Sequence, residues 1–124
     1  MRRPLAGFSL AALMFAAGGA MAGKADVIDV TVTPEKAGTY RFDVTIKSDD
    51  TGWDKYADQW EVVAPDGTVL GTRVLAHPHE TEQPFTRSLS GVDVPDGMTS
   101  VTVRARDKVE GYGGREMAVT IPAR

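Results

Sequence analysis

The chain has 124 residues, with 14 Lys plus Arg, 17 Asp plus Glu, two His and no Cys. This length is sufficient for one domain and too short for a two-domain enzyme built around a large cofactor. Hydrophobic residues make up 42% of the chain and charged residues 25%, as in globular rather than disordered proteins. The formal net charge of −3 argues against nucleic acid as the main partner.

The first 22 residues have the pattern of a secretory signal peptide. Two arginines near the start precede an apolar run over residues 5–17, which is shorter than the roughly 20 residues needed to span a bilayer. Residues 20–22, Ala-Met-Ala, match the small-x-small pattern that precedes signal peptidase cleavage. We therefore predict a signal peptide over residues 1–22 and a domain over residues 23–124. The alternative is an uncleaved leader that lies at the membrane interface.

Cleavage after Ala22 would change the character of the chain. It would remove two arginines and no acid, so the remaining 102 of the 124 residues would carry a net charge of −5 instead of −3. The expected location is periplasmic or extracellular. Because there is no Cys to carry a lipid, we expect no stable membrane anchor after cleavage. The missing Cys also excludes the disulfides of many small exported domains, so the hydrophobic core must stabilise the fold alone.

Seven short segments of the predicted domain alternate apolar and polar residues with the period of two typical of β-strands. The clearest covers residues 40–47, where four large apolar residues alternate with polar ones. Pro-Asp-Gly triplets at residues 65–67 and 95–97 predict tight turns. The pattern predicts an all-β fold, a seven-stranded immunoglobulin-like β-sandwich, with a small barrel as the alternative. The predicted strands are residues 28–32, 40–47, 60–64, 68–76, 85–90, 101–106 and 117–121.

The second half of the chain resembles a known class of domain. Residues 89–97, the strand at 101–106 and the Gly-Tyr-Gly-Gly segment at 111–114 resemble the E-to-G region of fibronectin type III and related bacterial sandwich modules. Trp60 resembles the core Trp of such domains, whereas Met98 stands where many of them have a corner Tyr. The chain also resembles small exported bacterial proteins of no known activity. The resemblance implies a fold and no function.

The order of the strands predicts which loops lie together. If consecutive strands run in opposite directions, the second, fourth and sixth loops lie at one end of the sandwich. These are residues 48–58, 77–83 and 107–114, and they contain both histidines and most of the clustered acids. The other three loops consist of ordinary turn residues. Because loops on a rigid sandwich commonly carry function, we predict the functional site at this end.

The segment His77-Pro78-His79-Glu80 is a candidate metal-binding motif. Pro78 favours an extended His77, and residues two apart in an extended chain point to the same side. His77, His79 and Glu80 would then suit Zn²⁺ or Cu²⁺. The alternative is a loop with two solvated or hydrogen-bonded histidines, since a His-x-His pair is a weak motif by itself. A complete site needs further ligands, for which the candidates are Glu82, Asp107 and Glu110.

The loop over residues 48–58 combines four Asp residues with two aromatic residues. Oxygen ligands at this density would suit Ca²⁺, although the spacing is not that of an EF-hand; the alternative is that the Asp side chains cap backbone N–H groups. Trp53 and Tyr56, together with Tyr112, are candidate partner-contact residues. If they are exposed, they form a platform for a protein or a glycan. The alternative is that they pack beneath the loop.

No catalytic residues are predicted, because the chain has no Cys nucleophile and no Ser in the context of a nucleophile elbow. The sequence therefore predicts a secreted or periplasmic binding module that is not an enzyme and needs no cofactor. The alternative is a periplasmic metal-binding protein that uses residues 77–80 for copper or zinc. A protein or glycan partner is expected and no nucleic acid, and the sequence makes no prediction about the oligomeric state.

Overall fold

The structure, a computed structural model, describes residues 23–123. The predicted signal peptide at residues 1–22 lies outside the described residues. No helix of the described part of the chain is long and apolar enough to cross a membrane.

Seven antiparallel strands form the domain, and each contains or overlaps one of the predicted segments. Strand pairing extends several of them beyond the alternating pattern; β3, for example, begins at Ala57 because Ala57 pairs with Asp107 of β6. A single-turn 3-10 helix at Lys36–Gly38 joins the first two strands. The strands are β1 (Asp26–Pro34), β2 (Thr39–Lys47), β3 (Ala57–Val63), β4 (Val69–Val74), β5 (Phe85–Asp93), β6 (Ser100–Asp107) and β7 (Met117–Thr120).

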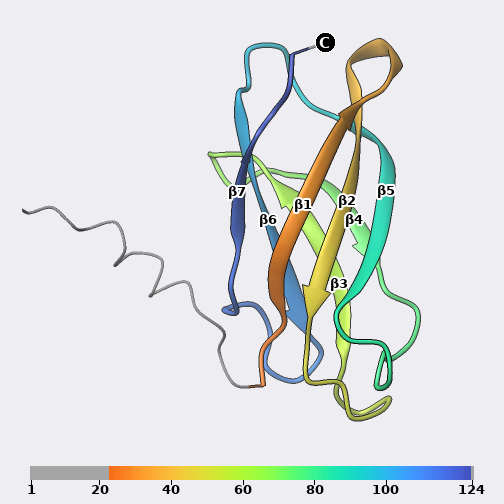
Figure 1. Cartoon of the computed structure of the whole chain (residues 1–124). Helices are drawn as coiled ribbons and strands as arrows, with labels where there is room; N and C mark the ends of the chain where they lie inside the picture. Colours follow the sequence, from red (N-terminus) through yellow and green to blue (C-terminus); the bar gives the residue numbers. More distant parts are fainter. Residues whose placement is uncertain (1–22, 124) are drawn as a thin grey trace, which may run out of the picture.

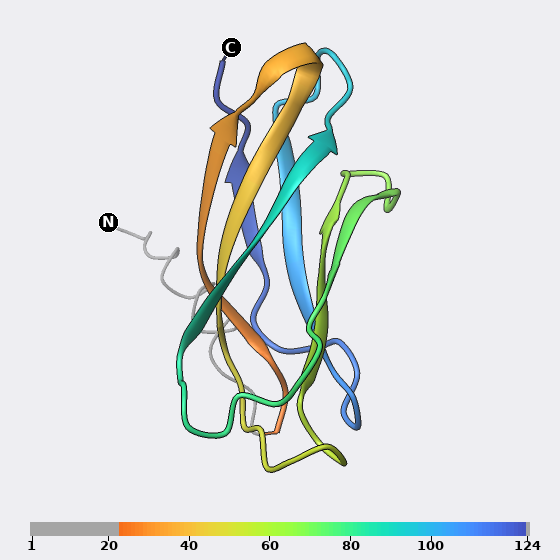
Figure 2. The ribbon, with the colours of Figure 1, turned by 90° about the vertical axis from the view of Figure 1, so that its right-hand side faces the viewer.

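The strands are divided between two sheets that face each other (Figures 1 and 2). One sheet has the order β1-β2-β5 and the other the order β4-β3-β6-β7. This arrangement is a β-sandwich of two separate sheets, so the prediction of an all-β sandwich is confirmed and the small barrel is not observed. The predicted turn at residues 65–67 joins β3 to β4, with Gly67 at a positive φ of 93°.

The core lies between the two sheets and is filled by the inward residues of the alternating strands. The four large apolar residues of β2 are all buried, and so are Trp60 of β3 and Phe85 at the start of β5. Each side chain of this size contributes roughly 1.5–3 kcal/mol when it is removed from water. This burial stabilises a domain that has no disulfide.

One strand arginine differs from the others in its partner. Arg87, Arg104 and Arg106 pair with carboxylates. Arg73 of β4 instead donates from Nη1 to the backbone oxygen of Ser88 on β5, at 3.0 Å, and its Nε is buried. Arg73 is the cross-strand neighbour of Trp60 on β3, so its side chain lies on the same inward face of the sheet. This places Arg73 at the open side between the two sheets.

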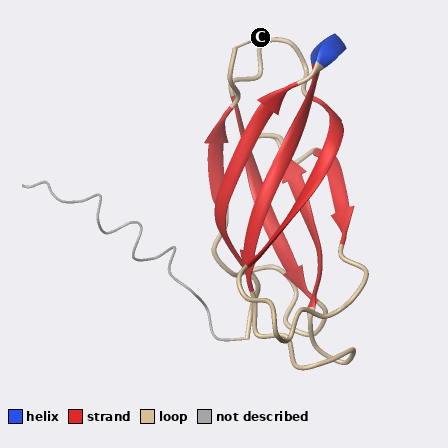
Figure 3. Ribbon diagram, turned by 45° about the vertical axis from the view of Figure 1, so that its right-hand side comes forward, coloured by secondary structure: helices blue, strands red, loops and turns tan. Residues whose placement is uncertain are grey.

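Three loops gather at one end of the sandwich, as the strand order predicted (Figures 1 and 3). They are the connections at residues 48–56, 75–84 and 108–116. We call this region the loop end. The described chain also begins there, because Lys24 Nζ donates to the backbone oxygen of Glu110 at 3.1 Å.

Candidate functional site

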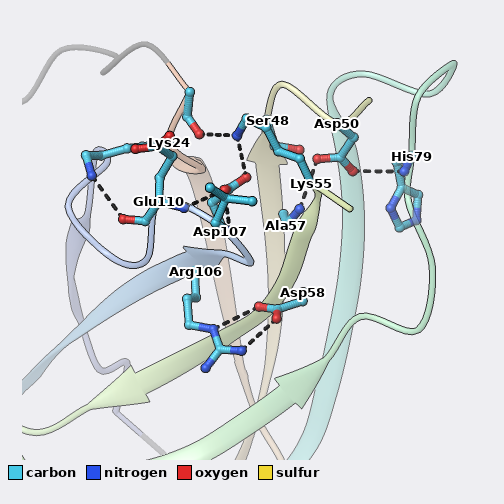
Figure 4. A network of polar contacts seen from close by, with 12 residues as sticks. Lys24, Ser48, Asp50, Lys55, Ala57, Asp58, His79, Arg106, Asp107 and Glu110 are labelled. Atoms are coloured by element: carbon cyan, nitrogen blue, oxygen red, sulfur yellow. Dashed lines mark hydrogen bonds and ion pairs between the residues drawn. The ribbon is translucent and has the colours of Figure 1, made fainter. Parts of the chain in front are cut away.

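Asp50 joins two of the three loops at the loop end (Figure 4). Its Oδ1 accepts the backbone N–H of Ala57 at 2.9 Å, and its Oδ2 accepts the backbone N–H of His79 at 2.8 Å. The side chain therefore caps backbone donors, which is the alternative to the calcium interpretation. A second carboxylate of this loop region, Asp58, forms an ion pair with Arg106 at 2.6 Å.

Asp107 organises the third loop from a fully buried position, with no side-chain exposure. Its Oδ2 accepts the backbone N–H groups of Val109 and Glu110, at 2.9 and 2.8 Å. Its Oδ1 forms an ion pair with Lys55 Nζ at 2.8 Å (Figure 4). Lys55 also donates to the backbone oxygen of Gly23. One buried carboxylate thus connects the first loop, the third loop and the start of the described chain.

Trp53 is the most exposed aromatic residue of the described chain, at 62%. Its ring lies edge to face with that of Tyr56, at a centroid distance of 5.7 Å. Lys108 holds both residues: its backbone N–H donates to Tyr56 O at 2.9 Å and its Nζ donates to Trp53 O at 2.7 Å. We call the group of Trp53, Tyr56 and Lys108 the Trp53 surface. It presents the ring of Trp53, and Lys108 from the third loop holds the backbone of that residue in place.

Tyr112, the third predicted partner-contact residue, packs onto the outer face of a sheet. The loop at residues 108–116 folds it back over the outer face of the sheet, where its hydroxyl accepts a hydrogen bond from Gln59 Nε2 at 2.8 Å. The guanidinium of Arg104 lies 4.4 Å from its ring centroid. Burial raises the pKa of Tyr112 above its ordinary value. The half-buried ring packs onto the sheet, and contact of Tyr112 with a partner stays a prediction.

The structure brings the two histidines together, at a ring centroid distance of 4.6 Å. His77 is exposed, and its Nδ1 lies 3.0 Å from the backbone oxygen of Pro78. His79 is 5% exposed and its ring stacks on Phe85 at 3.9 Å between centroids. Arg87 Nη2 donates to His79 Nε2 at 2.9 Å. His79 therefore packs against the core, while His77 faces solvent.

This arrangement limits the metal-binding interpretation of His77, His79 and Glu80. One nitrogen of His79 is hydrogen-bonded to a guanidinium and the other, Nδ1, is buried. Glu80 is exposed on the loop. Within residues 23–123, no three His, Asp or Glu side chains are placed to hold a metal ion. Zinc or copper binding by this loop stays a prediction, which a titration of each metal with and without the histidines tests.

Sequence reasoning missed the residues that hold the loop end together. Gln83 donates from Nε2 to the backbone oxygen of His79 at 3.0 Å and accepts the backbone N–H of Ser48 on Oε1 at 2.9 Å. Arg87 and Asp107 have similarly central roles. The only signals in the sequence were the position of Gln83 directly before Pro84 and that of Asp107 at the end of a strand. Neither signal identifies the partners in the other loops, Ser48 and Lys55, because these are distant in the chain.

Comparison with known proteins gives one informative relative. A curated protein from Halomicrobium mukohataei described as "Putative lipoprotein" is 46% identical to this chain over 96 residues. The matched region is 77% of this chain and 47% of that protein, so the chain spans about half the length of the relative. No family model matches the chain, and no solved structure matches it.

Proposed function

We propose that this chain is an exported binding module that presents the Trp53 surface to a protein or glycan partner and catalyses no reaction. Its β-sandwich would be of the fibronectin type III-like variety. In constant-type immunoglobulin domains, the fourth strand pairs within the sheet of the first strand. Here β4 pairs with β3 in the other sheet, which supports the fibronectin type III-like type.

Two observations support export. The first 22 residues follow the pattern of a cleavable secretory leader. The relative from Halomicrobium mukohataei is described as a lipoprotein, which is a class of exported protein. Lipid attachment through Cys is not part of the proposal, since the sequence contains no Cys.

Export predicts a defined new N-terminus. Cleavage after Ala22 is expected to yield a protein that begins at Gly23, whose backbone oxygen accepts a hydrogen bond from Lys55 at the loop end. The next residue, Lys24, donates to the backbone oxygen of Glu110. Edman sequencing or intact mass of the protein recovered outside the cytoplasm measures this. A protein recovered there with its N-terminus at Met1 would show that the leader is retained.

The exposed ring of Trp53 is the observation that carries the binding proposal. A large aromatic side chain is normally buried. An aromatic ring that is exposed on a loop held by hydrogen bonds is therefore a candidate for contact with a partner. Tyr56 and Lys108 restrict the conformations of the loop, so the loop would lose little conformational entropy when a partner binds. The other polar groups of the loop end favour binding over catalysis, because Asp50, Gln83 and Asp107 are already used in hydrogen bonds between loops.

Site-specific photo-crosslinking tests the proposal. A benzophenone amino acid at position 53 is expected to trap a discrete partner in cells that produce the protein. The matched control is position 69: Val69 is also exposed, at 45%, and lies at the start of β4 towards the opposite end of the sandwich. With the partner identified and purified, Trp53→Ala is expected to raise the Kd at least about tenfold, since aromatic residues dominate interface energetics.

Two results would count against the binding proposal. One is the same crosslinked species from positions 53 and 69, which would indicate nonspecific proximity. The other is an unchanged Kd for Trp53→Ala, which would remove Trp53 from the interface.

A further inference from the structure

Strand β4 lies at the edge of its sheet (Figure 2). Among the described residues it pairs only with β3, so its other side has no partner strand. The amide of Leu75, directly after the strand, donates to Asp58 O at 2.9 Å, and the backbone groups of alternate residues point to opposite sides of a strand. Arg73 therefore directs its backbone N–H and C=O groups to β3, whereas Thr72 and Val74 direct theirs to the open side.

In the part of the chain that the structure describes, each of the three other sheet edges has a feature that limits further pairing. β1 has a bulge near its start and ends at Pro34, which has no N–H to donate. β7 is only four residues long, and short edge strands are poor templates for pairing. On β5, Ser88 O already accepts the side chain of Arg73. The edge of β4 contains no Pro, Lys or acidic residue, and its Val74 is 66% exposed, so it is the edge most open to another strand.

Arg73 carries a positive charge that no carboxylate of the described residues balances. Its side chain is half-buried at the open side between the sheets, and its Nε is buried without a hydrogen-bond partner. Of the five N–H groups of the guanidinium, one on Nη1 donates to Ser88 O at 3.0 Å. Because removing a charge from water costs free energy unless the charge is paired, Arg73 would attract a carboxylate that approaches this edge.

A second copy of the same strand does not supply that carboxylate. β4 contains no Asp or Glu, so two paired β4 strands would bring two copies of Arg73 to the same inward face with no acid between them. A charged residue that points inward from an edge strand is one of the features that discourage such self-pairing. The occupant with matching charge is therefore an extended segment of another protein that carries an acidic residue on this face.

We propose that an extended segment of a partner protein adds to β4 as a further antiparallel strand along Thr72 to Val74, with an Asp or Glu directly opposite Arg73. Opposite residues of an antiparallel pair lie on the same face. The pair at Arg73 is of the kind without hydrogen bonds, in which the side chains lie closest. The two neighbours of the acid lie on the outer face beside Thr72 and Val74, where β-branched residues pack well.

This edge is separate from the Trp53 surface, so the proposal does not depend on the proposed function. Val69 at the start of β4 is outside the segment, because the pairing with β3 is irregular between Val69 and Gly71. The proposal therefore concerns the second half of the strand and predicts a partner sequence in which an acidic residue stands between two β-branched residues.

Amide hydrogen exchange, followed by nuclear magnetic resonance on the isotope-labelled protein, tests strand addition directly. The probe is a capped peptide of sequence Thr-Thr-Val-Glu-Val-Thr-Thr, and the matched control peptide has Lys in place of Glu. With the Glu peptide at saturation, the protection factors of the Thr72 and Val74 amides are expected to rise at least about tenfold, because both amides gain acceptors. The Arg73 amide already faces β3 and is the internal reference that is expected to change little.

The preference between the two peptides tests the role of Arg73. The Kd of the Lys peptide is expected to be at least about tenfold higher than that of the Glu peptide, because it brings a second cation to Arg73. Arg73→Gln is expected to remove this preference and Arg73→Glu to reverse it. Arg41→Gln is the matched control at a surface arginine of β2 and is expected to leave the preference unchanged. If circular dichroism shows that Arg73→Glu does not fold, Arg73→Gln carries the test.

Two further variants separate this edge from the rest of the molecule. Thr72→Pro removes an N–H group that faces the open side and leaves the pairing with β3 intact, so it is expected to raise the Kd of the Glu peptide at least about tenfold. Trp53→Ala is expected to leave that Kd unchanged. Failure of peptide binding at β4 is thus distinguishable from failure of the proposed function, which is tested at Trp53 with a different partner.

Three outcomes would overturn strand addition by an acidic segment. Unchanged protection of the Thr72 and Val74 amides at millimolar concentrations of the Glu peptide would show that the edge takes up no strand. Equal Kd values for the Glu and Lys peptides would remove Arg73 from the recognition. Protection of the same two amides that rises with protein concentration alone, together with a dimer in sedimentation, would assign the edge to a second copy of the chain.

Discussion

Replacing Asp107 with alanine is expected to lower the free energy of unfolding by about 3–5 kcal/mol, because it removes one partner of a buried ion pair. The carboxylate is fully buried, and Lys55 would lose its only carboxylate partner among the described salt bridges while it retains 21% exposure. The backbone N–H groups of Val109 and Glu110 would also lose their acceptor. Each buried donor left without a partner adds to the cost.

Denaturant unfolding followed by circular dichroism measures this loss as a change in midpoint at constant slope. Asp43→Ala is the matched control, since Asp43 also pairs with a cationic side chain but at the surface, where its partner Arg41 is 49% exposed. A surface pair of this kind is worth at most about 1 kcal/mol. Equal losses for the two variants would contradict a central role of Asp107. In the Asp107→Ala/Lys55→Ala double variant, the loss is expected to be smaller than the sum of the two single losses.

Gly114→Ala is expected to destabilise the domain by about 3 kcal/mol, the upper end of the range for overpacking. A Cβ at this position would lie 2.1 Å from the backbone oxygen of Ala25 and 2.8 Å from its carbonyl carbon. These are backbone atoms of a segment that is tied down: Arg115 N donates to Asp26 Oδ1 at 2.7 Å, and Val27 N donates to Arg115 O at 2.8 Å. The clash can be relieved only by moving the start of β1 away from this loop.

Gly71→Ala provides the comparison for the same chemical change. Its Cβ would meet side-chain atoms of Leu89 and Val92, at 3.0 and 3.3 Å, which can adjust by small rotations. We expect a loss of about 1 kcal/mol there, measured by the same denaturant unfolding. A Gly114→Ala variant as stable as wild type would mean that the contact between residues 25 and 114 is not maintained in solution.

Most of the fold could be predicted from the sequence, because strand formation here depends on local periodicity. The alternation in β2 places one residue in two towards the core, and all four predicted inward residues are buried. Turn residues such as Gly67 mark the ends of strands in the same local way. The prediction that the second, fourth and sixth loops share one end followed from strand direction alone. It is confirmed by the bonds of Asp50 and Lys108 between loops.

The candidate site could be predicted only in part. Trp53 is exposed as the binding hypothesis required, but Tyr112 lies on the sheet with Arg104. In the Gly-rich segment at residues 111–114, Gly111 and Gly113 have positive φ values of 74° and 122°, which glycine adopts readily. For Gly114 the constraint is different, since it is the close approach of Ala25 that leaves no room for a Cβ. Such an approach depends on a residue almost the whole domain away.

By itself, the sequence determined the approximate positions of the seven strands, the all-β class of the fold and the shared end at which the unusual loops lie. The tertiary structure decided that the strands form two separate sheets. The strand positions depend on residues a few positions apart in the sequence. The shared end of the loops depends on the reversal of direction from one strand to the next. Only the tertiary structure decided what the loop residues do. The contacts of His79 with Phe85 and Arg87 join its loop to strand β5, and the ion pair of Asp107 with Lys55 joins the third loop to the first. Whether an imidazole is a metal ligand or part of the core packing depends on which groups surround it. Its burial, the charges near it and its hydrogen-bond partners arise only when the chain is folded.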